Sequence, residues 1–170
     1  MNKKKWRTTL MRSACFTGHR VIPQTEEIKE RLYSVLERWI CTKGITDYYA
    51  GGAVGWDTLA AATVLKLREV YPQVKLHLVL PCASEQQTAK WTSAQQSEFF
   101  RIRVLADSVE YICENYFKGC MKERNNRLVE YADTCCFCFW DPGIFSSGTG
   151  QTVRLAKKKQ LMIVNFKDNY

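Results

Sequence analysis

Two hydrophobic patterns alternate along this chain of 170 residues. Short runs of mostly apolar residues predict buried strands, and between them apolar residues recur every three or four positions, as on one face of an α-helix. The predicted strands are residues 13–16, 47–50, 74–80, 108–113, 134–140 and 161–166. The predicted helices are residues 28–40, 56–71, 93–105, 121–132 and 148–158.

Threonine, glycine and proline mark several element ends. Thr25 precedes the first helix and Gly44 follows it, which is typical of a helix start and a helix stop. Pro72 ends the second helix, and residues 81–91 are polar enough to predict a loop.

Alternating strands and helices predict an α/β fold with right-handed crossovers. We expect a Rossmann-like, three-layer α/β/α architecture with a mainly parallel sheet of about six strands. No repeat, low-complexity tract or linker divides the sequence, so residues 1–170 are expected to form one domain. Residues 1–11 form a basic N-terminal segment for which we expect flexibility.

The composition bears on membrane insertion and cell compartment. Hydrophobic residues make up 46% of the chain, which is typical of a globular protein. No stretch approaches the roughly 20 apolar residues that span a bilayer. Residues 11–16 are too short and too polar for the apolar part of a signal peptide. The prediction is a cytoplasmic protein without a membrane partner.

The chain contains eight cysteines, most of them in predicted strands. Reduced thiols in a core explain this better than a disulfide framework. Cys135 and Cys138 have CxxC spacing, but in a strand Cys136 and Cys138 share one face and Cys135 lies on the other. Since no histidine is nearby, we expect no metal site.

The formal net charge of +8 raises the possibility of nucleic-acid binding. The lysine clusters, however, are residues 3–5 at the start of the chain and residues 157–159 at the end of a helix. Solvated basic ends are the simpler interpretation, and nucleic acid is not the favoured partner.

Three strand-to-helix junctions combine glycine with small or polar residues: residues 17–20, 51–57 and 146–152. In a parallel sheet all three open at the carboxyl edge of the strands, where ligands bind at the switch point. A glycine loop that leads into a helix presents backbone N–H groups at the positive end of the helix dipole, which suits phosphate. One such loop is also explained by a tight turn, but three on one edge favour a phosphate site.

The order of these motifs resembles the YpsA-like branch of the SLOG superfamily. The similarity begins with residues 15–20 (CFTGHR) and 50–57 (AGGAVGWD). It continues with residues 124–125 (RN) and 147–149 (SGT), so it spans nearly the whole chain. The resemblance implies a Rossmann-like fold with a pocket for a nucleotide derivative. The candidate ligand-binding residues are Thr17, Gly18, His19, Arg20, Gly51, Gly52, Gly55, Asp57, Arg124, Asn125, Ser147, Gly148 and Thr149.

The same superfamily contains the Lonely Guy phosphoribohydrolases, which use an arginine and a glutamate to split a nucleoside monophosphate into base and ribose 5-phosphate. Residues 121–125 (MKERN) place Arg124 on that arginine. The glutamate is missing, because Thr152 or Arg154 stands in its place and neither acts as a carboxylate in N-glycosidic cleavage. Catalysis is therefore not favoured. The remaining candidates for catalytic residues are Arg124, Glu123, Asp57 and His19.

Individual residues near the loops carry further expectations. Arg20 suits a bidentate contact with phosphate, and His19 suits a hydrogen bond to phosphate, acid–base chemistry or a structural bond. Asp57 either caps the second helix or binds a ribose hydroxyl. Trp140 is a candidate for stacking on a base, although core packing explains such residues more often. His77 is expected to be a core or edge residue of its strand.

Three functions remain open. The leading hypothesis is binding or sensing of a nucleotide or nucleotide-derived, phosphate-bearing ligand, with Arg20 and Arg124 neutralising the phosphate. In this hypothesis the backbone holds the phosphate at Gly18, Gly51, Gly52, Gly148 and Thr149. The alternatives are a nucleoside-monophosphate phosphoribohydrolase with Glu123 or Asp57 as an unusual acid, and single-stranded nucleic-acid binding as in DNA-processing relatives. The resemblance also makes a homodimer an expectation; no cofactor beyond the nucleotide is expected.

Overall fold

The computed structural model describes residues 12–23, 25–144 and 146–168, so the basic segment 1–11 lies outside the described residues. Within them, one six-stranded sheet has the order β4-β3-β2-β1-β5-β6. All five pairs of neighbouring strands are parallel. The strands are β1 (Arg12–Gly18), β2 (Ile45–Ala50), β3 (Lys75–Leu80), β4 (Ser108–Tyr111), β5 (Cys135–Phe139) and β6 (Met162–Asn165).

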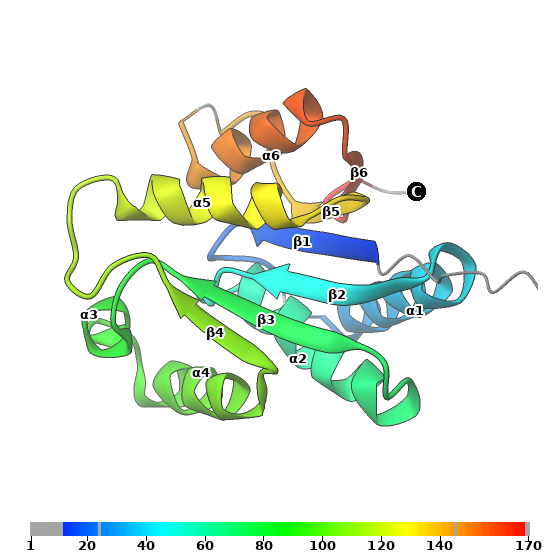
Figure 1. Cartoon of the computed structure of the whole chain (residues 1–170), viewed down its shortest axis with the longest axis horizontal. Coiled ribbons are helices and arrows are strands. Elements are labelled where there is room, and N and C mark those ends of the chain that lie inside the picture. Colours follow the sequence, from blue (N-terminus) through cyan, green and yellow to red (C-terminus); the bar gives the residue numbers. More distant parts are fainter. Residues whose placement is uncertain (1–11, 24, 145, 169–170) are drawn as a thin grey trace, which may run out of the picture.

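Helices cover both faces of this sheet (Figure 1). The helices α1, α2 and α4 lie on one face, and α5 and α6 lie on the other. Their bounds are α1 (Glu26–Lys43), α2 (Trp56–Val70), α3 (Ser84–Thr88), α4 (Ser93–Leu105), α5 (Cys120–Tyr131) and α6 (Gly148–Lys158). The predicted α/β fold, with three layers and a parallel sheet of six strands, is confirmed.

The strand order creates a switch point between β1 and β5. From β1 the chain proceeds outward through β2, β3 and β4, and then returns to place β5 on the other side of β1. The connections after β1 and β5 therefore diverge from neighbouring strand ends and leave a crevice between them. The His19 amide still donates to the Phe139 carbonyl at 3.1 Å, which holds the two strand ends together where the crevice begins.

Local signals explain the ends of α1. The Thr25 side chain accepts a hydrogen bond from the Ile28 amide, as expected of an N-cap. Gly44 has the left-handed backbone (φ +69°) that ends helices, and its amide donates to the Ile40 carbonyl. Between the caps, Leu32, Leu36 and Ile40 are buried.

Apolar side chains form one core layer on each face of the sheet. Cys135 and Phe137 of β5 belong to the layer beneath α1, α2 and α4. Cys136 and Cys138 belong to the layer beneath α5 and α6. The strand alternation that argued against a CxxC metal site is therefore confirmed.

Two predictions from the sequence are wrong, apart from differences of up to three residues at other element ends. Residues 81–91 were expected to form a loop, but they contain the single-turn helix α3, which apolar periodicity cannot reveal in so polar a segment. The strand expected at residues 108–113 ends at Tyr111, so Cys113 lies outside the sheet. The Ile112 amide still donates to the Leu80 carbonyl at 2.9 Å, so the chain stays beside β3 for one residue after the strand ends.

A lysine fixes the far end of α5. The ammonium group of Lys159 donates to the carbonyls of Val129, Glu130 and Ala132, at 2.9, 2.6 and 2.6 Å. These carbonyls belong to the end of the helix, where no intrahelical donor remains. The contact ties the end of α6 to α5.

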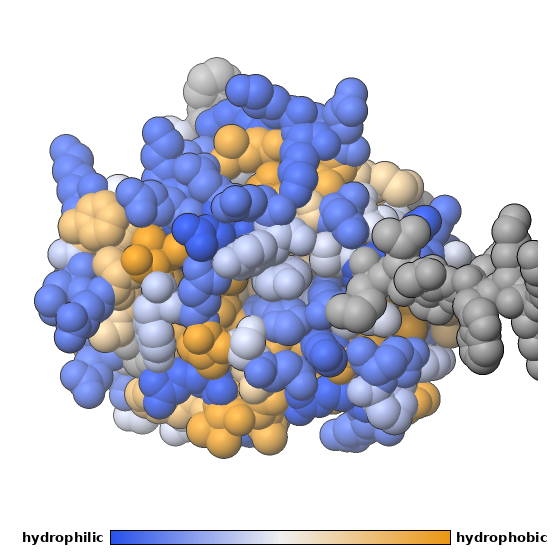
Figure 2. Space-filling model, viewed as in Figure 1, coloured by the Kyte–Doolittle hydropathy of each residue, from blue (hydrophilic) through white to orange (hydrophobic). Residues whose placement is uncertain are grey.

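Hydrophilic residues cover most of the molecular surface seen in Figure 2, with apolar residues gathered in smaller areas. Among the helices of the described residues, none combines the length and apolar character needed to cross a bilayer.

Candidate functional site

A pocket of about 320 Å³ lies at the carboxyl ends of the strands, at the switch point between β1 and β5. The start of α2, the first turns of α5 and the start of α6 enclose it together with the end of β1. Its lining residues are Phe16, Thr17, Gly18, His19, Arg20, Ala53, Asp57, Met121, Arg124, Asn125, Leu128, Ser147, Gly148 and Thr149. Ten of the thirteen predicted ligand-binding residues are in this set.

Arg124 is the buried cation of the pocket. Its guanidinium donates from Nη1 to the Gly51 carbonyl at 2.5 Å and from Nε to Asn125 Oδ1 at 2.9 Å. Nη1 also lies 3.9 Å from Asp57 Oδ2, and both side chains are less than a tenth exposed. Burial lowers the pKa of Arg124, while the nearby Asp57 carboxylate acts against this shift. The arginine is therefore held in one position by three different groups.

Asp57 supplies the only carboxylate among the described residues that line the pocket. Its Oδ2 accepts the Ala53 amide at 3.3 Å, and its buried Oδ1 has no hydrogen-bond partner in the described part of the chain. Burial raises the pKa of Asp57, and the charges of Arg124 and Arg20 oppose that rise. The N-cap of α2 is Gly55, so Asp57 bonds to the loop instead of capping the helix.

The loop after β1 brings His19 and Arg20 to the pocket. His19 Nε2 accepts the Asp141 amide at 2.9 Å, which assigns the proton of the neutral ring to Nδ1. Burial lowers the pKa of His19, with Asp141 acting against it and Lys167 adding to it. Arg20 is exposed, yet its charge is felt by both Asp57 and Arg124. The lining thus carries two guanidinium groups and one carboxylate.

The N-terminus of α6 forms another wall of the pocket. Ser147 is its N-cap, and Ser147 Oγ accepts the Gly150 amide at 3.0 Å. The amides of Gly148 and Thr149 come first in the helix, where no intrahelical acceptor exists. Asn125 Nδ2 donates to the Gly148 carbonyl at 3.4 Å and so joins α5 to this turn.

The glycines of the loop after β2 do not line the pocket, although the sequence placed them there. The Gly51 carbonyl accepts from Arg124, and the Gly52 carbonyl accepts from Gln87 at 3.0 Å. A Cβ at Gly52 would lie 2.4 Å from Leu80, and one at Gly55 would lie 2.3 Å from the Arg20 carbonyl oxygen. Gly52 and Gly55 also have positive φ, so this loop needs glycine for its own close packing.

Sequence reasoning missed four residues of the lining. Phe16, Ala53, Met121 and Leu128 contribute apolar or small surface, which has no chemical signature in a single sequence. The sequence placed Met121 and Leu128 in a predicted helix, residues 121–132, and gave neither of them a ligand contact. Both line the pocket, and Leu128 also belongs to the core layer beneath α5 and α6.

The remaining candidates lie outside the lining. Glu123 is exposed on α5, and Trp140 packs beneath the Lys157 ammonium, 5.2 Å from the ring centroid. Thr152 is fully buried and donates to the Gly148 carbonyl at 2.9 Å. Neither position equivalent to the missing glutamate, Thr152 or Arg154, brings a carboxylate to the pocket.

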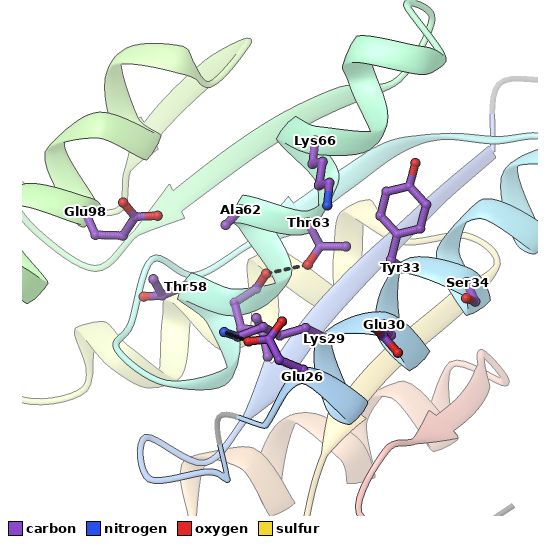
Figure 3. Close-up of a pocket in the computed structure, with 11 residues that line it drawn as sticks. Glu26, Lys29, Glu30, Tyr33, Ser34, Thr58, Ala62, Thr63, Lys66 and Glu98 are labelled. Atoms are coloured by element: carbon purple, nitrogen blue, oxygen red, sulfur yellow. Dashed lines mark hydrogen bonds and ion pairs between the residues drawn. The ribbon is translucent and has the colours of Figure 1, made fainter.

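A larger hollow of about 560 Å³ lies on the outer side of α1 and α2 (Figure 3). Helix sides line it, and its charges are mixed: Glu26 pairs with Lys29 at 2.7 Å, and Lys66 lies 5.4 Å from the centre of the Tyr33 ring. Its two cations, Lys29 and Lys66, are not buried, and three carboxylates lie beside them in the lining, those of Glu26, Glu30 and Glu98. Its chemistry does not suit phosphate, so size alone does not make it the site.

Residues 18–168 match the model of the YspA SLOG family. The chain belongs to this family. The match includes every pocket residue except Phe16 and Thr17, so the family resemblance inferred from the motifs is confirmed.

Three curated proteins are similar to this family member. A UPF0398 protein of Halalkalibacterium halodurans is 26% identical over 93 residues, which cover 54% of this chain and 48% of that protein. A UPF0398 protein of Oenococcus oeni is 26% identical over 103 residues, which cover 61% of this chain and 54% of that protein. The SPbeta prophage-derived protein YoqJ of Bacillus subtilis is 23% identical over 151 residues, which cover 82% of this chain and 85% of that protein. The matches span about half the length of the two UPF0398 proteins.

Proposed function

We propose that this SLOG-family protein binds a nucleotide or nucleotide-derived ligand, and that the phosphate of the ligand lies at the switch-point pocket. The observation that carries the proposal is the charge of the pocket. Two guanidinium groups, Arg20 and Arg124, face one carboxylate, and the positive end of α6 faces the same space. An anion would therefore be stabilised there.

The pocket also offers the contacts that a phosphate and a sugar need. The first amides of α6 suit phosphate oxygens, and the exposed Arg20 suits a bidentate contact at the mouth. The carboxylate of Asp57 belongs to the lining and accepts hydrogen bonds, which suits a ribose hydroxyl. A volume of 320 Å³ is near the lower end of the range for ligand pockets, about 300 to 1,000 Å³. The base would therefore extend toward the mouth.

The first experiment is a thermal-shift screen of the purified protein. It compares nucleoside mono-, di- and triphosphates, dinucleotides and ADP-ribose derivatives with inorganic sulfate at equal ionic strength. A ligand that binds only the folded state raises the melting temperature. A hit is then titrated by calorimetry to obtain its dissociation constant.

The decisive variant is Arg20→Ala. Because Arg20 is exposed and no hydrogen bond ties it to the fold within the described residues, its loss should spare folding. Loss of a charged phosphate contact should weaken binding about 10-fold or more. Arg101→Ala is the matched control, since Arg101 is an exposed arginine of α4 that pairs with Glu98. Equal affinities of the two variants, or a screen without any hit, would contradict the proposal.

A second candidate is cleavage of a nucleoside monophosphate, and Asp57 is the observation that favours it. Its buried carboxyl group lies beside Arg124 and has a raised pKa, as expected for an acid–base group. The assay measures ribose 5-phosphate released from the common nucleoside monophosphates. Release that Asp57→Asn abolishes would support hydrolysis, whereas binding without release would leave a binding or sensing protein.

A further inference from the structure

A row of polar side chains crosses the sheet far from the switch point. It consists of Asp47 on β2, His77 on β3 and Ser108 on β4. His77 lies two residues before Val79, which belongs to the core layer beneath α5 and α6, so the two side chains share that face. On this side α5 packs across β1, β2 and β3, α6 packs on β1, β5 and β6, and β4 lies at the edge of the sheet beyond α5 (Figure 1).

Hydrogen bonds join the three residues in a line. His77 Nε2 lies 2.8 Å from Asp47 Oδ1, and His77 Nδ1 lies 2.7 Å from Ser108 Oγ. A carboxylate only accepts hydrogen bonds, so Nε2 carries the ring proton and Nδ1 is left with its lone pair. The Ser108 hydroxyl therefore donates to Nδ1. This is the arrangement in which a histidine acts as general base for a serine nucleophile.

Neighbouring groups hold this line in place. Asp47 Oδ2 accepts from the Thr46 hydroxyl at 2.7 Å, so both carboxylate oxygens are bonded. The Tyr49 ring stacks on the imidazole, with centroids 4.7 Å apart and planes 20° apart. The side chains of Asp47 and His77 are only 11% and 16% exposed, whereas Ser108 is exposed. The base is thus fixed and the nucleophile is open to solvent.

We propose that Ser108 is a nucleophile activated by His77, and that it accepts acyl groups from small activated esters. Ser108 Oγ forms a bond to the ester carbonyl carbon while its proton passes to His77 Nδ1. The bond from that carbon to the leaving oxygen breaks, and the leaving oxygen takes the proton. Water then attacks the acyl carbon and gives a proton to His77 Nδ1. The bond from that carbon to Ser108 Oγ breaks, Oγ takes the proton back, and the acid leaves. Asp47 is a positioning residue that fixes the tautomer and stabilises the imidazolium.

The position of the row sets the substrate class. Ser108 lies on an edge strand at an exposed position, so the acyl group approaches from solvent. Small esters with good leaving groups fit such an open site. This inference does not depend on nucleotide binding, because none of the three residues lines the switch-point pocket.

The test uses a fluorophosphonate, which reports the same attack: a bond forms between Ser108 Oγ and phosphorus, and fluoride leaves. The full chain is labelled, digested, and read by mass spectrometry for the site and rate of modification. Labelling at Ser108 should slow about 100-fold in His77→Gln, as expected when a general base is lost. Asp47→Asn should slow it as well, and Ser108→Ala should abolish it. Ser97→Ala is the matched control, because Ser97 is an exposed serine on α4.

A second measurement compares the labelling of the folded and the unfolded wild-type chain, and this comparison needs no variant. The wild-type protein is labelled in buffer and in denaturing urea, and p-nitrophenyl acetate hydrolysis is followed in parallel. Faster labelling of Ser108 in the folded chain, with acetate release that Ser108→Ala removes, supports the proposal. Labelling no faster than in urea, or modification spread over other serines, overturns it and makes the row a structural hydrogen-bond network.

Discussion

Two of the glycine-containing loops beside the pocket, residues 51–55 and the start of α6, use glycine in opposite ways. In the loop of residues 51–55, glycine allows chain segments to approach closely, and its carbonyls are occupied by Arg124 and Gln87. At the start of α6, a Cβ on Gly148 would meet only Asn125 Nδ2, at the ordinary distance of 3.5 Å. We call residues 51–55 the closed loop, because its groups bind other parts of the protein, and the start of α6 the open wall, because its amides face the pocket. Glycine alone therefore does not identify a ligand contact.

The largest effect is expected when the closed loop loses its buried partner. Arg124→Ala removes the cation beside Asp57 and the donor to Gly51, which should lower the free energy of unfolding by about 3–5 kcal/mol. Burial already raises the pKa of Asp57 above its ordinary 3.8, and loss of Arg124 raises it further.

The sign of the accompanying pH dependence follows from this raised pKa. A folded state that binds a proton more tightly loses stability as pH rises from the unfolded pKa through the folded one. The deficit of Arg124→Ala should therefore be smaller at pH 5 than at pH 8 in urea denaturation. In Arg124→Ala/Asp57→Asn the stability deficit should no longer depend on pH. If the deficit of Arg124→Ala is itself independent of pH, the proposed coupling between Arg124 and Asp57 is contradicted.

Glycine substitution tests the contrast between the loops directly. Gly55→Ala should cost about 3 kcal/mol, because φ is +83° and the new Cβ would overlap the Arg20 backbone. Gly148→Ala should leave stability within about 1 kcal/mol of the wild type, since the position is helical and uncrowded. Similar unfolding midpoints for both variants would remove the distinction between the closed loop and the open wall.

A smaller effect is expected at the cap of the open wall. Ser147→Ala removes the bond to the Gly150 amide and should cost about 1 kcal/mol. Thr25→Ala removes the equivalent cap of α1, which lies outside the pocket, at a similar cost. Calorimetry with a ligand identified by the screen should show weaker binding only for Ser147→Ala. Equal affinities would place the ligand away from α6.

The smallest effect concerns the histidine beside the open wall. Because burial lowers the pKa of His19 below 6.5, the unfolded chain binds the proton more tightly, and stability should fall as pH drops below 6.5. Protonation would also break the bond that Nε2 accepts from the Asp141 amide. His19→Gln should flatten this part of the stability profile in thermal melts. If the dependence of stability on pH below 6.5 is the same in His19→Gln and the wild type, other groups cause it.

The sequence predicted the architecture because the relevant forces are local or periodic. Hydrophobic spacing located every strand and the five longer helices, and Ser93–Leu105 and Gly148–Lys158 have the predicted bounds. The single turn of α3 escaped, because its stability comes from contacts such as that of Gln87 with the Gly52 carbonyl. Such contacts join residues distant in the chain.

The site was predicted less completely, for a related reason. Polar residues near the carboxyl ends of the strands, such as Thr17 of β1 and Asp57 at the start of α2, were found because chemistry and topology agree there. The orientation of Gly51 and Gly52 depends on how the loop packs against Arg124 and Leu80, which no local pattern encodes. The row of Asp47, His77 and Ser108 escaped for the same reason, since three strands must pair before it exists.

The anchoring of Lys159 changes the meaning of the basic run at residues 157–159. Its ammonium group donates to three carbonyls at the end of α5, and Lys157 lies over the Trp140 ring. Two lysines of one run thus have structural contacts: Lys159 binds the end of α5, and Lys157 packs on an aromatic ring. A count of all three lysines as one basic patch would therefore overstate the number of ammonium groups that are free to contact a nucleic acid at this helix end.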